Sequence, residues 1–151
     1  MPSISRSALV VHSPQRMYEL VNEVANYPDF LPWCDASEVH EHTDSGMLAT
    51  VAIAKGGINK TFTTRNQLKA GQSIQMQLVD GPFSQLEGLW KFEPLGPEAC
   101  KISLNLNFEF DSPVLRASFG KVFDQIAGSM VAAFVLRANQ TLGSSKSGSR
   151  K

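Results

Sequence analysis

Residues 99–113 read ACKISLNLNFEFDSP, and the first twelve of them form the clearest strand pattern in the chain. From 102 to 110 every even position is Ile, Leu or Phe, and every odd position is Ser, Asn or Glu. Such alternation is typical of an antiparallel sheet that is covered on one face and solvated on the other. Asp111-Ser112-Pro113 then matches a helix start, with Asp or Ser as the cap and Pro in the first turn. The stretch therefore predicts a strand that leads directly into a helix.

The helix that starts here is predicted to run to about Leu142. At ~1.5 Å per residue it is long enough to cross a whole sheet. Beyond it, residues 143–151 read GSSKSGSRK and predict a disordered polar tail, which leaves 1–142 as a single domain. The apolar stripe of the helix consists of Leu115, Phe119, Val122, Phe123, Ile126, Met130, Val131, Phe134 and Val135.

Upstream of residue 99 the chain also alternates with a period of two, and turn residues such as DSG, KGG and DGPF separate the segments. A first strand at 4–11 precedes a short amphipathic helix, for which Ser13 is a candidate N-cap and Pro14 fits the first helical position. The other predicted strands are 36–42, 47–55, 58–69, 73–79 and 85–92.

These elements predict an α+β fold in which an antiparallel sheet of about seven strands wraps one long C-terminal helix. A sheet of this size curls when it twists. A curled sheet cannot pack flush along a straight helix, so an apolar gap between the two is expected, and this gap is the candidate binding site.

Composition limits the classes of partner. The 151 residues carry 14 basic and 14 acidic side chains, for a net charge of zero, so we expect no bulk attraction to nucleic acid and no DNA partner. A local basic patch and transient contact with a membrane surface stay open. The N-terminus lacks the pattern of a signal peptide, and no apolar run approaches the roughly 20 residues that span a bilayer, which predicts a cytoplasmic protein.

No catalytic or metal-binding motif is present in the sequence. Cys34 and Cys100 are predicted to be reduced thiols, and His40 and His42 lack a third ligand, so an exposed strand edge explains them better than a metal site. The nearest candidate carboxylates are Asp80 and Glu109, which do not form an inward acid–base pair. We therefore expect no enzymatic activity and no required cofactor.

Strand parity indicates which side chains face the gap. Between 58 and 69 the inward positions include Lys60, Thr64 and Asn66, which are either the polar spot of an apolar pocket or, for Lys60, a frayed strand end in water. The predicted ligand-binding residues are Tyr27, Phe30, Leu31, Trp33, Lys60, Phe62, Thr64, Met76, Phe83, Trp90, Leu106, Phe108, Phe119, Phe123, Ile126 and Met130.

Two further features leave alternatives open. Residues 26–34 read NYPDFLPWC, unusually apolar for a connection, and form either a mouth over the gap or a plug at the end of the core. Arg65 occupies an outward-facing position of its strand. It either forms an ion pair with a neighbouring strand, for example with Glu87, or contacts a bound macromolecule. Lys55 and Lys69 are the other candidates for a local basic patch near one hairpin.

The chain resembles the coenzyme Q-binding branch of the START-like (polyketide cyclase/lipid transport) superfamily, and within it the bacterial ribosome-association toxins. The resemblance covers about Ser5 to Leu142. The segments that carry it are SRSALV, MYELVNEVANYPDFLPWC, KTFTTRNQL, LVDGPFSQLEGLWKF and FGKVF.

The resemblance implies a helix-grip fold and a hydrophobic ligand, ubiquinone or a related isoprenoid lipid, bound between sheet and helix in support of respiration without redox catalysis. As an alternative it implies a toxin that binds the large ribosomal subunit and blocks subunit association. A sequence with zero net charge departs from what a dedicated ribosome binder is expected to show.

Overall fold

A computed structural model describes the backbone of residues 3–148 and the side chains of residues 3–140. The elements follow one another in the order that the sequence predicts. They are β1 (Ser3–Val10), α1 (Pro14–Asn22), the 3-10 helix η1 (Val24–Asp29), β2 (Cys34–His42), β3 (Gly46–Lys55), β4 (Ile58–Lys69), β5 (Ser73–Asp80), β6 (Phe83–Gly96), β7 (Ala99–Phe110) and α2 (Pro113–Gly148).

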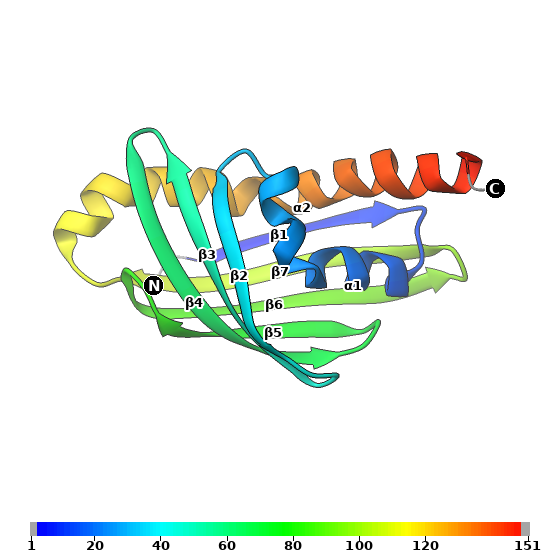
Figure 1. Cartoon of the computed structure of the whole chain (residues 1–151), viewed down its shortest axis with the longest axis horizontal. Helices are drawn as coiled ribbons and strands as arrows, with labels where there is room; N and C mark the ends of the chain where they lie inside the picture. Colours follow the sequence, from blue (N-terminus) through cyan, green and yellow to red (C-terminus); the bar gives the residue numbers. More distant parts are fainter. Residues whose placement is uncertain (1–2, 149–151) are drawn as a thin grey trace.

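The seven strands form one antiparallel sheet in the order β1-β7-β6-β5-β4-β3-β2. Six of them form a meander from β2 to β7, and β1 returns to pair with β7 (Figure 1). Short turns make this connectivity possible because antiparallel neighbours need only a few connecting residues. The edge strands are therefore β1 and β2.

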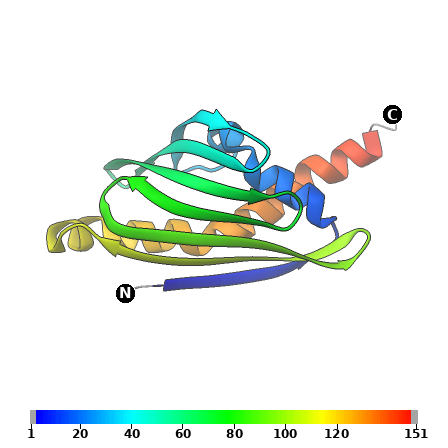
Figure 2. The same cartoon turned by 90° about the horizontal axis from the view of Figure 1, so that it is seen from below.

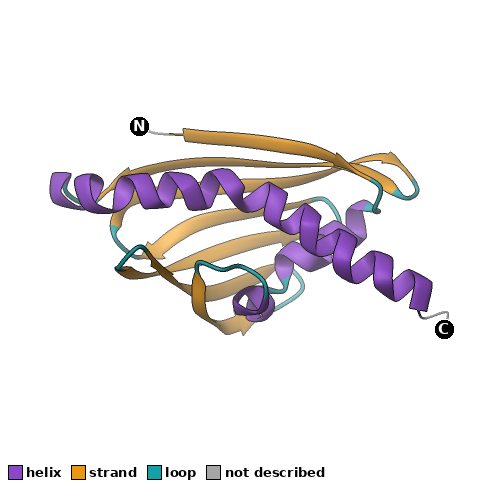
Figure 3. Ribbon diagram, turned by 90° about the horizontal axis from the view of Figure 1, so that it is seen from above, coloured by secondary structure: helices purple, strands orange, loops and turns teal. Residues whose placement is uncertain are grey.

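The sheet is strongly curved, and α2 lies across its concave side (Figure 2, Figure 3). Its strands run in markedly different directions at the two ends of the sheet, as expected when twist accumulates over many strands (Figure 1). The first turn of α2 is capped by Ser112, whose hydroxyl accepts a hydrogen bond from the Leu115 backbone N–H at 3.2 Å. The predicted helix start is thereby confirmed.

The helix α2 continues to Gly148, so residues 143–148 are helical where the sequence predicts a disordered tail. Adding turns to an existing helix avoids the cost of nucleation, and no proline interrupts this segment. Residues 149–151 of the predicted tail lie outside the described residues.

Part of α2, Pro113–Gln140, is long and apolar enough to cross a membrane by length and composition alone. In this fold 39% of its most apolar 18-residue window is buried. A long helix that packs into the core of a protein also meets this criterion of length and apolar composition, because it needs a long apolar stripe.

Aromatic rings fill one end of the space between sheet and helix. Phe123 of α2 packs edge-on against Phe83 and Phe108, with ring centroids 4.9 and 4.8 Å apart. Phe110 and Phe119 complete this cluster. Because these rings fill this end of the core, an opening can lie only farther along α2.

The helix α1 and η1 close the other end. Ser13 caps α1 by accepting a hydrogen bond from the Arg16 backbone N–H at 3.2 Å, and Pro14 occupies the first turn, as the sequence predicts. Pro28 lies inside η1. It is the fifth of the six residues of η1, and because it has no N–H to extend the hydrogen-bonded turns, η1 ends one residue later at Asp29.

Candidate functional site

An apolar cavity of about 70 Å³ lies between the sheet and the middle of α2. Seventeen residues line it, and fifteen of them are apolar or aromatic. They come from η1, the loop after it, β3 to β7 and α2, so that the whole grip encloses the space. The lining residues are Val24, Tyr27, Trp33, Ala49, Val51, Ile53, Phe62, Thr64, Asn66, Met76, Leu86, Trp90, Leu106, Phe123, Ile126, Ala127 and Met130.

Thr64 and Asn66 form a polar spot on the β4 wall of this cavity. Both are buried, with 6% and 5% of their surface exposed, and the Thr64 hydroxyl donates to the Asn66 side-chain oxygen at 2.9 Å. A buried hydroxyl and amide retain further hydrogen-bonding capacity, which an entering polar group can use. The polar-spot interpretation therefore fits these two residues.

Lys60 is a correction to that interpretation, because it lines neither this cavity nor the groove described below. It is half-buried and pairs with Ile53, close to the turn between β3 and β4. There its long side chain can reach water, but the strand end is not frayed, because Lys60 lies within an unbroken register of β3 and β4.

The loop 26–34 is held in place by several hydrogen bonds. The buried Tyr27 hydroxyl donates to the Val21 carbonyl oxygen at 2.5 Å, and the Ala54 backbone N–H donates to the Trp33 carbonyl oxygen at 2.9 Å. Leu31 and Trp33 are buried, with 1% and 7% exposure. Phe30 is only half-buried and packs edge-on against Phe134 of α2.

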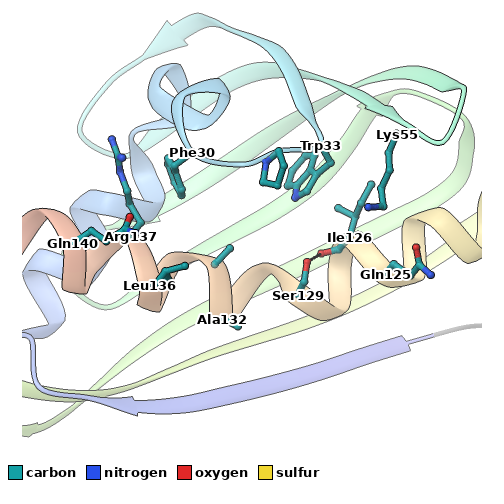
Figure 4. A pocket seen from close by; sticks show the side chains of 12 residues that line it. Phe30, Trp33, Lys55, Gln125, Ile126, Ser129, Ala132, Leu136, Arg137 and Gln140 are labelled. Carbon is teal, nitrogen blue, oxygen red and sulfur yellow. Dashed lines mark hydrogen bonds between the residues drawn. The ribbon is translucent and has the colours of Figure 1, made fainter.

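A surface groove of about 620 Å³ lies beside the cavity, between this loop, the end of β3 and the outer side of α2 (Figure 4). Its apolar side chains include Phe30, Ile126 and Leu136. Lys55 and Arg137 lie toward its two ends, and the Arg137 guanidinium stands 4.9 Å from the centre of the Phe30 ring (Figure 4). The remaining lining residues are Pro32, Trp33, Gln125, Ser129, Ala132, Ala133 and Gln140.

Trp33 and Ile126 line both the cavity and the groove. These two side chains therefore form the wall that separates the interior from the surface. Within loop 26–34, Leu31 and Trp33 are buried in the core, while Phe30 borders the groove. A mouth over a bound ligand stays a prediction.

Ten of the predicted ligand-binding residues line the cavity, and Phe30 lines only the groove. The other predicted residues line neither space. Leu31 fills the core under the loop, Lys60 lies near the hairpin, and three phenylalanines belong to the packed aromatic cluster: Phe83, Phe108 and Phe119. Strand parity identifies inward residues correctly, but it does not separate a packed end of a core from an open one.

Sequence reasoning missed the β3 wall of the cavity, which is formed by Ala49, Val51 and Ile53. Both sets of alternate residues in β3 are largely apolar, so parity within that strand is ambiguous. The neighbouring strand β4 indicates which set faces inward, because Ala49 pairs with the inward Thr64 and Val51 pairs with the inward Phe62.

Ionisable groups are scarce in the cavity wall, where the phenol of Tyr27 donates to the Val21 carbonyl oxygen. No carboxylate, histidine, lysine or arginine is among the residues that line it. Asp80 is exposed, and Glu109 forms an ion pair with Arg116. Among the described residues no group of three or more His, Cys, Asp or Glu side chains could hold a metal ion.

The thiols and the histidines of β2 behave as structural groups. Cys34 and Cys100 are free and buried, and burial raises the pKa of the Cys34 thiol to about 11. A thiol with this pKa is a poor nucleophile at neutral pH. His40 lies on the edge strand β2 and bonds to the Thr50 hydroxyl at 2.8 Å, which confirms the interpretation as a strand edge.

The predicted basic patch near one hairpin does not form. Lys55 and Lys69 lie at opposite ends of the β3–β4 pair, about 36 Å apart by strand rise. Arg65 is exposed and pairs with Glu41 at 3.7 Å, not with Glu87. The outward parity of Arg65 is correct, but acidic residues lie on both sides of it in the sheet, and parity does not choose between them.

The family model for polyketide cyclase/dehydrase and lipid transport matches residues 10–135. The chain belongs to this family. The cavity between sheet and helix agrees with the hydrophobic-ligand binding that the family suggests.

Curated proteins with similar sequences include ribosome association toxins and a coenzyme Q-binding protein. The Escherichia coli K12 protein named ribosome association toxin RatA is 54% identical over 140 residues, which are 93% of this chain and 89% of that protein. The protein of the same name from Pseudomonas aeruginosa is 48% identical over 93% of this chain and 97% of its own. The mitochondrial coenzyme Q-binding protein COQ10 of Drosophila melanogaster is 29% identical over 92% of this chain and 59% of its own.

Similar solved structures confirm the helix-grip fold. An 18 kDa protein of Caulobacter crescentus has a TM-score of 0.74 and 29% identity, with 95% of this chain and 99% of that chain covered. The ZhuI aromatase/cyclase of a Streptomyces species has a TM-score of 0.82 at 16% identity, with 93% and 95% covered, and shows the fold alone.

Proposed function

We propose that this protein binds, without chemical conversion, a hydrophobic ligand of the quinone or isoprenoid-lipid class and thereby supports respiration. The observation that carries the proposal is the enclosed apolar cavity with one polar spot at Thr64 and Asn66. A neutral polar head would meet this spot, and an apolar tail would leave past Trp33 and Ile126 into the groove. No redox or acid–base group of the chain is required for binding.

The cavity must widen to take such a ligand. Its volume of about 70 Å³ corresponds to roughly two water molecules at ~30 Å³ each, whereas sites for drug-sized ligands span about 300–1,000 Å³. Met76 and Met130 line the cavity and are unbranched, so they can change rotamer at low cost. Burial of the tail contributes on the order of 25 cal/mol per Å², and widening offsets part of that gain.

The test is to purify the protein from a quinone-producing host and to identify extracted lipid by mass spectrometry. We expect a stoichiometric lipid, together with a rise in melting temperature when ubiquinone is added. Ala127→Leu should lower retention because it fills the cavity, whereas Ala117→Leu, exposed on the same helix, should not. Absence of lipid combined with an unchanged melting temperature would contradict the proposal.

A second function is favoured by one specific observation, the 54% identity over 93% of the chain to a protein named ribosome association toxin. We propose that the protein also associates in the cytoplasm with the large ribosomal subunit and hinders subunit joining. Sucrose gradients after overexpression should show more free subunits and fewer assembled ribosomes. A profile identical to that of the empty vector would eliminate this function.

A further inference from the structure

The outer face of the sheet, which points away from α2, is rich in neutral hydrogen-bonding side chains. On this face, residues that pair with one another across five strands form a row without charged side chains. Uncharged side chains of this kind can hydrogen-bond a partner without adding to the charge of the surface. The row consists of Ser5, Asn105, Leu89, Gln75 and Gln67.

The next row toward the β6–β7 hairpin contains two lysines. Lys91 and Lys69 face outward there, separated by Ser73, which pairs with both. Two strand spacings of ~4.8 Å place their backbones about 9.6 Å apart. Lys101 lies one outward position farther along β7, opposite Glu93. We call these three exposed residues, Lys69, Lys91 and Lys101, the lysine face.

Positive charge exceeds negative charge on the lysine face. Of the side chains that the structure describes, no carboxylate oxygen lies within 4.0 Å of any of the three ammonium groups. Lys69 and Lys91 also line one surface depression of about 610 Å³, in which Glu93 is the sole carboxylate among the lining residues. In a chain with zero net charge, this end of the sheet therefore carries a local excess of positive charge.

We propose that the lysine face docks on the sugar–phosphate backbone of ribosomal RNA. This inference rests on the proposed association with the large subunit and assigns the surface that makes it. Lysines supply the contacts to phosphates, while neighbouring Ser, Asn and Gln side chains hydrogen-bond phosphate oxygens and 2′-hydroxyls. The cavity and groove lie on the opposite side of the sheet, so RNA docking leaves ligand binding open.

A second group of lysines near the β3–β4 hairpin fits RNA less well. Lys60 is half-buried, and Lys55 borders the apolar groove. Lys121 is exposed on α2, but Asp124 follows it by one helical turn, where opposite charges attract. This group carries the same formal charge as the lysine face and therefore provides a matched control.

The experiment measures binding of the full-length protein to purified large ribosomal subunits between 50 and 200 mM salt. One variant combines Lys69→Gln, Lys91→Gln and Lys101→Gln. The control combines Lys55→Gln, Lys60→Gln and Lys121→Gln, and circular dichroism melting verifies that both remain folded. The lysine-face variant should bind about 100-fold more weakly at 100 mM salt, and its slope of log affinity against log salt should fall by about 2–3. The control should bind like the wild type.

The outcomes separate the surface assignment from the function on which it rests. If the wild type does not bind subunits, the proposed ribosome association itself fails, and the lysine face fails with it. If the wild type binds and the lysine-face variant binds equally well, only the surface assignment is overturned. Wild-type binding that is independent of salt would indicate a contact with ribosomal protein and would likewise overturn it.

Discussion

At the scale of single residues, the site depends on how completely each side chain is enclosed. Thr64 and Asn66 are buried and partner each other, and this leaves a small polar spot in an otherwise apolar wall. In the loop, neighbouring residues differ sharply, since Leu31 is 1% exposed while Phe30 is half-buried at the groove. Substitutions of Leu31 and Phe30 can therefore test core packing and ligand retention separately.

Leu31→Ala should lower the free energy of unfolding by about 2–5 kcal/mol, because it leaves a void in packed core. Phe30→Ala should cost less, about 1–2 kcal/mol, because half of that ring is already in water. The ordering of lipid retention should be the reverse, with the larger loss in Phe30→Ala. Urea denaturation and lipid extraction measure the two effects, and equal stability losses would contradict this division.

At the scale of elements, one glycine in β6 determines how the residues of β5 and β7 that line the cavity are placed. Gly88 of β6 lies between Met76 and Leu106, both of which line the cavity. A Cβ atom at position 88 would lie 2.5 Å from the terminal methyl of Met76 and 3.0 Å from a Leu106 methyl. The absence of a side chain there gives these two residues the space that they occupy.

Gly88→Ala should therefore push the Met76 methyl toward the cavity and reduce uptake of added ubiquinone. Because a flexible methionine can adjust, we expect a loss of only about 1–2 kcal/mol in stability. Gly96→Ala on the same strand is the control, since a Cβ there would meet nothing within 4 Å. Undiminished uptake in Gly88→Ala, measured by the shift in melting temperature, would show that the cavity is not the site.

At the scale of the whole molecule, stability and binding are concentrated at different places along α2. The first turns of α2 pack into the aromatic cluster, in which Phe119 is fully buried. The middle of the helix, around Ile126, borders the cavity and groove. The lysine face lies on the other side of the sheet. The molecule thus separates a rigid end, an apolar interior and a polar exterior.

This separation predicts that Phe119→Ala lowers stability by about 3–5 kcal/mol without lowering lipid retention per folded molecule. Phe119→Leu serves as a milder variant if the alanine form does not fold. Thr64→Val should give the opposite pattern, with a larger loss of retention than of stability. Parallel losses of stability and retention in both variants would argue that the core responds as one unit.

The sequence by itself determined the elements, because period, caps and turn residues are local properties of the chain. Residues 99–113 correctly predicted β7 and the start of α2, and β4 was predicted to the residue. Parity correctly placed Thr64 and Asn66 inside and Arg65 outside.

Only the tertiary structure decided where the interior is open and which distant side chains meet. Phe83 and Phe123 are both inward and aromatic, yet only Phe123 reaches the cavity. Lys55 and Lys69 flank one hairpin pair in sequence but lie at its opposite ends, whereas Lys69 and Lys91 meet across β5. The physical reason is that a void and a charge patch both depend on the curvature and register of the whole sheet, which no local pattern encodes.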